Sequence, residues 1–242
     1  VDANSKALAV ATVQDCIKLW NVSYSRPKQL GSAAARFQNE DGEPLGVIRS
    51  IRVNSDGSRV SILADLLYGT GPDSKVWVYD LEADKFCNIE CGGYTVNHFW
   101  EGKDNRLLAV EVLNNGRSGG LDQDDESNRI NNLLTYFVGS DDEMNPKLFF
   151  KDKMPCKAQG EGTHSVVPIG ISVPHIYFGA SNPSEGLEDG GVQPSFSAVT
   201  MPDFAGIRID DNQDIIGPLL DFSYHVACGN LDKAYTTIKH AA

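Results

Sequence analysis

One pair of side chains has the types and spacing that acid-base chemistry requires. His98 precedes Glu101 by three residues, and an imidazole oriented by a carboxylate is a common general base. The stretch VNHFW (96–100) alternates like a strand, however, so His98 and Glu101 project from opposite faces. We therefore expect His98 to make a structural hydrogen bond, either between neighbouring sheets or to a loop.

Two acidic runs resemble cation-binding loops. The first, DQDDE (122–126), matches the start of a calcium loop, but Ser127 takes the place of the turn glycine and Leu133 that of the bidentate glutamate. A solvated acidic loop is the prediction there. In the second run (210–214), the acidic residues are expected near a helix N-terminus, where they favour the helix dipole.

The remaining chemistry-bearing residues give no positive case for catalysis. Cys87 and Cys91 form half of a zinc pattern, but no second close Cys or His pair accompanies them, so the five cysteines are expected to be structural thiols in a reducing compartment. The sequence contains no GxxxxGK[ST], GxGxxG or HExxH motif. We expect a protein that is not an enzyme and that has no cofactor and no metal site.

The amino-acid composition limits the classes of partner that we expect. Twenty-one Lys and Arg against 33 Asp and Glu give a net charge of -12 without a basic cluster, so nucleic acid is not expected as a partner. No apolar run is long enough for a membrane span. Because the 242-residue chain begins at Val1 inside an apparent strand pattern, we also expect a fragment of a longer protein.

The segment SKVWVYD (74–80) alternates with period two, which indicates a strand. Asp80 to Asp84 then form a polar turn into a second strand, KFCNIE. If Trp77 points outward, opposite Val76 and Val78, it is the best candidate for a contact with a partner protein. Upstream, strands at 47–53 and 59–64 flank the turn signal Asp56-Gly57, which completes an antiparallel four-stranded unit.

The same unit recurs along residues 1–209, which indicates a mainly β fold. Each unit needs neighbours to bury both of its faces, and the weak WD-like strand endings at Trp20-Asn21 and Tyr79-Asp80 favour the last blades of a WD40-like β-propeller. Disordered or variable loops are expected at about 25–45, 113–131 and 181–195. Apolar stretches punctuated by Pro168 and Pro174 predict edge or closing strands.

Residues 210–242 change to helical periodicity. Ile215, Leu219, Phe222 and Val226 lie three or four residues apart, with a start expected near Gly217 and an end at Gly229-Asn230. A second helix follows. The placement of small and aromatic residues predicts the first α-hairpin of a TPR-like solenoid.

Several segments, in this order, resemble the intraflagellar transport protein 140 family, in the region where the second propeller meets TPR-like helices: PDSKVWVYDLEADKF, YTVNHFWEGKDNRLLAVEV, SVPHIYFG, PDFAGI and FSYHVACGNLDKAYTTIKH. The resemblance implies a non-enzymatic scaffold of intraflagellar transport complex A. It further implies retrograde transport in cilia and flagella, a location at the cytoplasmic side of the cilium and basal body, and partners among complex A subunits, tubby-like cargo adaptors and ciliary membrane cargo.

Two alternatives stay open. A vesicle-coat subunit would share the propeller-to-solenoid architecture. A metal-dependent propeller hydrolase would need inward-facing Asp, Glu, His or Asn at the starts of blades, and Asn97 is the only fair candidate. If blades are missing, the open edge of the propeller predicts poor solubility of residues 1–242 in isolation.

Overall fold

The computed structural model describes residues 1–12, 14–23, 25–67, 71–113, 131–156, 166–183, 192–207 and 213–241. The acidic run at 122–126 and most of the expected loops at 113–131 and 181–195 lie outside these ranges, as do residues 210–212 of the second acidic run.

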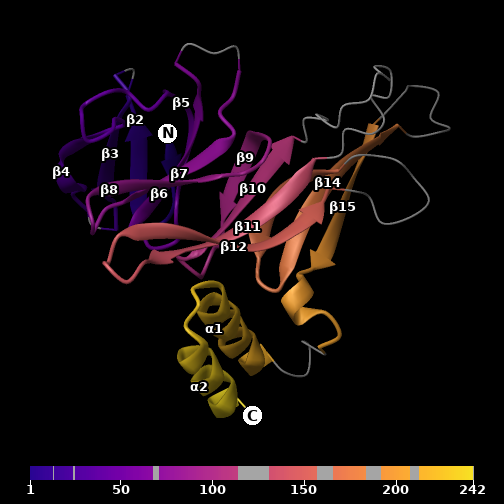
Figure 1. Cartoon of the computed structure of the whole chain (residues 1–242). Helices are drawn as coiled ribbons and strands as arrows, with labels where there is room; N and C mark the ends of the chain where they lie inside the picture. Colours follow the sequence, from indigo (N-terminus) through magenta and orange to yellow (C-terminus); the bar gives the residue numbers. More distant parts are fainter. Residues whose placement is uncertain are drawn as a thin grey trace.

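The described chain is mainly β, as predicted, and its strands form four antiparallel sheets that we call blades 1 to 4 (Figure 1). Neighbours in each sheet are consecutive in sequence, so every blade is a simple meander. Blade 1 comprises β1 (Asp2–Ala3), β2 (Ala7–Ala11), β3 (Cys16–Asn21) and β4 (Lys28–Arg36). Blade 2 comprises β5 (Val47–Val53), β6 (Arg59–Asp65), β7 (Lys75–Asp80) and β8 (Lys85–Glu90). Blade 3 comprises β9 (Tyr94–Trp100), β10 (Leu107–Leu113), β11 (Asn132–Ser140) and β12 (Pro146–Pro155), and the three-stranded blade 4 comprises β13 (Val167–Ser172), β14 (His175–Pro183) and β15 (Val192–Thr200).

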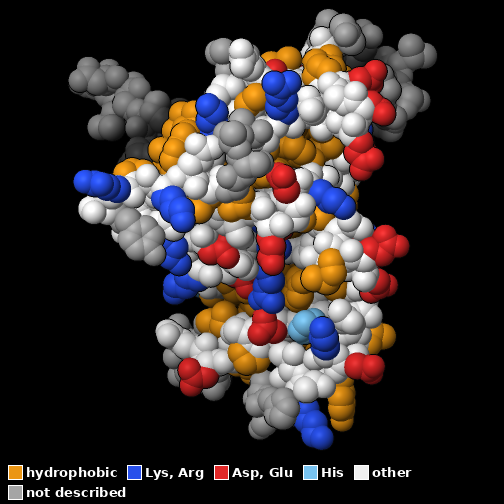
Figure 2. Space-filling model, turned by 90° about the vertical axis from the view of Figure 1, so that its left-hand side faces the viewer, with side chains coloured by type: hydrophobic (Ala, Val, Ile, Leu, Met, Phe, Trp, Pro, Cys, Tyr) orange, Lys and Arg blue, Asp and Glu red, His pale blue; other side chains and the backbone are white. Residues whose placement is uncertain are grey.

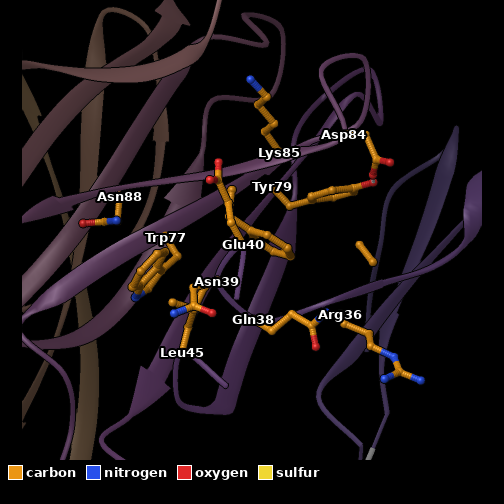
Figure 3. Close-up of a pocket in the computed structure, with 12 residues that line it drawn as sticks. Arg36, Gln38, Asn39, Glu40, Leu45, Trp77, Tyr79, Asp84, Lys85 and Asn88 are labelled. Atoms are coloured by element: carbon orange, nitrogen blue, oxygen red, sulfur yellow. Dashed lines mark hydrogen bonds between the residues drawn. The ribbon is translucent and has the colours of Figure 1, made fainter. Parts of the chain in front are cut away.

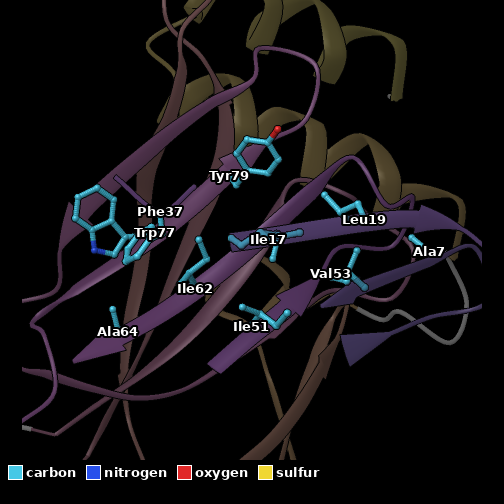
Figure 4. Packing of buried hydrophobic residues seen from close by; sticks show 12 residues of the cluster. Ala7, Ile17, Leu19, Phe37, Ile51, Val53, Ile62, Ala64, Trp77 and Tyr79 are labelled. Carbon is cyan, nitrogen blue, oxygen red and sulfur yellow. The ribbon is translucent and has the colours of Figure 1, made fainter. Parts of the chain in front are cut away.

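Successive blades stack face to face, and each interface is an apolar cluster. Blades 1 and 2 enclose the cluster around Phe37, Ile62 and Trp77 (Figure 4). Blade 2 then packs on blade 3, and blade 3 packs on blade 4. The middle strands β6, β7, β10 and β11 are therefore buried on both faces, whereas the outer strand β8 alternates between half-buried and exposed residues. This packing is consistent with the expected WD40-like propeller blades.

The loop expected at about 25–45 was wrong for much of its length. Residues Lys28–Arg36 form β4, which pairs with β3 as the fourth strand of blade 1. Phe37 follows and is 2% exposed. The strand lacks an alternating pattern because its centre, Gly-Ser-Ala-Ala-Ala, consists of small residues, so the pairing partner rather than the local sequence fixes its conformation. The ends of the loop expected at 181–195 likewise belong to β14 and β15.

Two helices follow blade 4, α1 (Ile216–Ala227) and α2 (Leu231–Ala241), after the short 3-10 turns η2 (Pro202–Phe204) and η4 (Gln213–Ile215). The helical hairpin and its boundaries are confirmed, with Pro218 in the first turn of α1 and Gly229 at a φ of 77° between the helices. Asp214 lies in η4, just before α1, as expected for an acidic residue near a helix N-terminus. In the described part of the chain, neither helix has the length and apolarity to cross a bilayer.

Candidate functional site

A groove of about 640 Å³ opens at the outer rim between blades 1 and 2 (Figure 3). One wall is the end of β4 with the connection that follows it, and the other is formed by β7 and β8. The rim between blades 2 and 3 is arranged differently, because there the outer strands β8 and β12 lie against each other. The groove therefore exists where β4 and the connection 37–45 hold blade 1 apart from the outer edge of blade 2.

Aromatic side chains form the floor of this groove, and their ring contacts fix them in place. Phe37 meets Trp77 edge to face at 5.4 Å between ring centroids and meets Phe86 at 5.5 Å, and the Tyr79 and Phe86 centroids are 5.0 Å apart. The contacts join the two blades. The floor is thus preformed, with Trp77 and Tyr79 only 7% and 3% exposed, and its accessible apolar part comes mainly from the half-buried Phe86 and Leu45.

The polar ends of two of these rings are also bound. Trp77 Nε1 donates to Asp73 Oδ2 at 3.3 Å, and Tyr79 Oη donates to Asp84 Oδ1 at 2.6 Å. Burial, with the Asp84 hydrogen bond second, raises the pKa of the Tyr79 hydroxyl above its usual value, so it stays a donor at neutral pH. Neither ring can leave its position without losing a hydrogen bond, which holds the floor in place.

Charged side chains of both signs stand at the rim. Arg36 at the end of β4 and Glu40 in the connection are exposed, and within the described ranges neither has a hydrogen-bond or ion-pair partner for its side chain. On the β8 side, Lys85 Nζ donates to Asn145 Oδ1 at 2.7 Å. Among the residues that the structure describes, the groove therefore combines an aromatic floor with one cation, Arg36, and one anion, Glu40, that have no partner.

The partner contact predicted for Trp77 depended on an outward-pointing side chain, and the structure does not meet this condition. Trp77 is 7% exposed and packs in the cluster between blades 1 and 2, because the unforeseen β4 and Phe37 cover the face opposite Val76 and Val78. Trp77 nevertheless contributes to the floor of the groove. A role in partner contact stays a prediction, now as part of that floor.

His98 makes the structural contact that its strand position predicts. Its Nε2 lies 2.9 Å from Ser50 Oγ and its Nδ1 lies 2.8 Å from Ser61 Oγ, so one fully buried imidazole in blade 3 joins two strands of blade 2. Burial lowers the pKa of His98 to about 3, with the charges of Arg52 and Arg49 acting in the same direction. The ring is therefore neutral at physiological pH and joins the blades by hydrogen bonds alone.

The other chemistry-bearing residues are bound in turns and strands. Glu101 accepts from the backbone N–H groups of Lys103 and Asp104, and its other oxygen lies 3.4 Å from Val173 N in blade 4. Asn97 accepts from the N–H of His98. Among the described residues, no group of three or more His, Cys, Asp or Glu is placed to hold a metal ion.

The cysteines are free thiols in the structure. Burial raises the pKa of Cys87 and of Cys156 to about 12 in each case, which leaves both thiols protonated and unreactive at neutral pH. The expectation of structural thiols is consistent with this.

A second polar cluster, which the sequence did not single out, attaches α1 to blade 3. Arg106 pairs with Asp104 at 2.5 Å and with Asp221 of α1 at 2.7 Å, and its guanidinium lies 4.5 Å from the Tyr224 ring centroid. Nearby, Lys151 pairs with Asp203 at 2.7 Å, and Ser223 Oγ donates to the same carboxylate at 2.6 Å. The helices are thereby fixed to the blades by partly buried charges.

Comparison with known proteins gives one family match. Residues 1–91, which comprise blades 1 and 2, match the family described as IFT140 second beta-propeller. The amino-terminal part of the chain is therefore similar to that propeller. The groove lies wholly within the matched residues.

Some solved structures are also similar to the chain at low sequence identity. The Cps50 (Swd1) beta-propeller domain of Myceliophteria thermophila is 12% identical, with a TM-score of 0.41, over 82% of this chain and 58% of that chain. The acylaminoacyl peptidase of Pyrococcus horikoshii is also 12% identical, with a TM-score of 0.41, over 82% of this chain and 32% of that one. The chain thus spans less than two thirds of either, and these similarities carry no information about function.

Proposed function

We propose that the protein is a non-enzymatic scaffold subunit of intraflagellar transport complex A. In this role it supports retrograde transport in cilia and flagella, and the trafficking of ciliary membrane proteins, through protein-protein contacts at the cytoplasmic side of the cilium and basal body. The observation that carries the proposal is the match of residues 1–91 to the IFT140 second beta-propeller. The other complex A subunits and tubby-like cargo adaptors are the partners that this assignment proposes.

The distribution of polar groups supports a binding role rather than a catalytic one. Ionisable groups inside the stack of blades are held by structural hydrogen bonds, as His98 and Glu101 illustrate. The side of the molecule shown in Figure 2 carries acidic and basic side chains interspersed with apolar ones. Such a mixed surface is usual for a globular protein and is compatible with contacts to other proteins.

The second helix presents a further surface for this role. Ala234 is 2% exposed, whereas Leu231 and Tyr235 are 67% and 70% exposed and Ile238 is 38% exposed. These three apolar residues lie at helical spacing on one face. In the proposed function, further TPR-like helices or another subunit would cover this face.

Affinity purification tests the proposal. The protein carrying an epitope tag is expressed in ciliated cells, and co-purifying proteins are identified by mass spectrometry. Complex A subunits should be enriched, and a Leu231→Glu/Tyr235→Glu variant should retain fewer of them than a Thr236→Glu/Lys239→Glu control. Enrichment of coatomer subunits, association that follows Golgi membranes, or no complex at all would reject the assignment.

A further inference from the structure

We propose that the groove between blades 1 and 2 binds a short, extended peptide segment of a partner protein, with an apolar side chain between an acidic and a basic residue. The inference rests on the proposed scaffold function, and it names the site and the chemical class of ligand. It is carried by the juxtaposition of an aromatic floor with two charges of opposite sign, Arg36 and Glu40, which have no partner within the described part of the chain.

The size and shape of the groove suit a few residues of extended chain. Its volume of about 640 Å³ lies within the roughly 300–1,000 Å³ that is usual for ligand sites. One of its walls is formed by the strands β7 and β8, so a ligand lying against this wall can follow the strand direction (Figure 3). Extended peptides place alternate side chains on one face, which allows one side chain to contact the floor while its neighbours contact the rim.

The floor selects an apolar side chain. Phe86 and Leu45 are the accessible apolar residues of the floor. The nearly buried rings of Trp77 and Tyr79 support them and are ordered by ring contacts and by hydrogen bonds to Asp73 and Asp84. Binding to an ordered surface costs little conformational entropy, and aromatic surfaces of this kind are typical anchors in protein interfaces.

The charged side chains at the rim determine which charges a ligand should carry. A free guanidinium and a free carboxylate at the same groove favour a ligand that carries both signs, and they disfavour a polyanion or a polycation. The carboxylate of the ligand would pair with Arg36 in a bidentate manner, and a basic residue would pair with Glu40. Lys85 is already bonded to Asn145 and contributes less to this selection.

Peptide selection tests the inference. A random dodecapeptide phage library is selected on the protein, and enriched sequences are then measured against an Arg36→Glu/Glu40→Lys variant. Both substituted residues are exposed, so the fold should be preserved. The matched control is Asp232→Lys/Lys239→Glu on α2, which also inverts two exposed charges without changing the net charge and does not line the groove.

Enriched peptides should carry an apolar residue between an acid and a base. They should bind the groove variant about tenfold more weakly than the wild type and the control, because two attractive charge contacts become repulsive. Peptides with the two charges exchanged should bind the groove variant better than the wild type. The inference is overturned if no peptide is enriched, if binding is indifferent to the groove variant, or if the enriched peptides carry charge of one sign only.

This outcome is separable from that of the proposed function. A groove variant that loses the peptides but still co-purifies with complex A subunits supports the groove and the function independently. Peptide binding at the groove in a protein that co-purifies with coatomer would keep the groove and reject the function.

Discussion

Replacement of Gly139 by alanine should detach α1 from blade 3. Gly139 lies in β11, and a Cβ added there would meet Tyr224 Oη at 2.5 Å and two ring carbons of Tyr224 at 3.3 Å. Tyr224 cannot retreat freely, since its ring packs edge to face on Phe137 at 5.5 Å and under the guanidinium of Arg106. Overpacking of this kind costs about 1–3 kcal/mol.

The tyrosine hydroxyl is the decisive atom, so a double-mutant cycle isolates its effect. In a Tyr224→Phe background the nearest atoms lie at 3.3 Å, and alanine in place of glycine within a strand should then be neutral or stabilising by up to about 1 kcal/mol. The expected coupling between the two sites is therefore about 1–3 kcal/mol.

Urea unfolding of the four proteins measures the coupling, and hydrogen exchange of the α1 amides shows whether the helix is the element released. An equal cost of Gly139→Ala in both backgrounds would refute the reasoning. So would a loss of stability with unchanged protection of α1.

Two further predictions concern the contacts between blades. The pKa of His98 is about 3 in the folded protein and near 6.5 in the unfolded chain. The contribution of His98 to the free energy of unfolding is therefore fully present above pH 6.5 and declines by about 1.4 kcal/mol per pH unit between pH 6.5 and pH 3. Urea midpoints measured across this range should fall in the wild type and change less in His98→Gln, and parallel profiles would contradict the prediction. Asn54, which is 0% exposed, accepts from Arg59 N and donates to Asn105 O of blade 3, each at 3.0 Å, so Asn54→Ala should cost about 2–3 kcal/mol. The half-buried Asn4 of blade 1 donates to Asn54 O at 2.6 Å, and Asn4→Ala should cost about 1 kcal/mol. Similar urea midpoints for the two variants would contradict the larger role expected for Asn54.

The parts of the fold that the sequence predicted are those with strong local patterns. Strands in blade 2 alternate or form apolar runs, and Asp56-Gly57 provides the turn, with Gly57 at a φ of 81°. The helical hairpin could be predicted from the three- and four-residue spacing of its apolar residues and from Gly229, which separates the two helices. Strands β4 and β15 escaped prediction because serine, alanine and proline interrupt them, and their conformation depends on pairing with β3 and β14.

Less of the candidate site could be predicted from the sequence. Trp77 could be identified as a candidate partner contact, and His98 as a contact within the fold. The groove, however, requires that residues 35–45 lie against residues 77–88, which depends on β4 and on the stacking of two blades. Arg36 and Glu40 lie in a segment that reads as a polar loop, and nothing in their local sequence marks them as a pair.

The stacking of blades also explains why binding sites of this protein should lie at rims and edges. A middle strand such as β11 is buried on both faces, so its side chains are committed to packing. An ionisable group placed in such a strand needs a dedicated partner, as Glu111 of β10 has in Asn131, because an unpaired buried charge is too costly. The side chains that remain accessible to a binding partner are those of the outer strands, of the connections between blades and of the outward face of α2. A protein built in this way recognises other proteins through peripheral surfaces, and the groove beside β4 is where apolar and charged groups of that periphery come together.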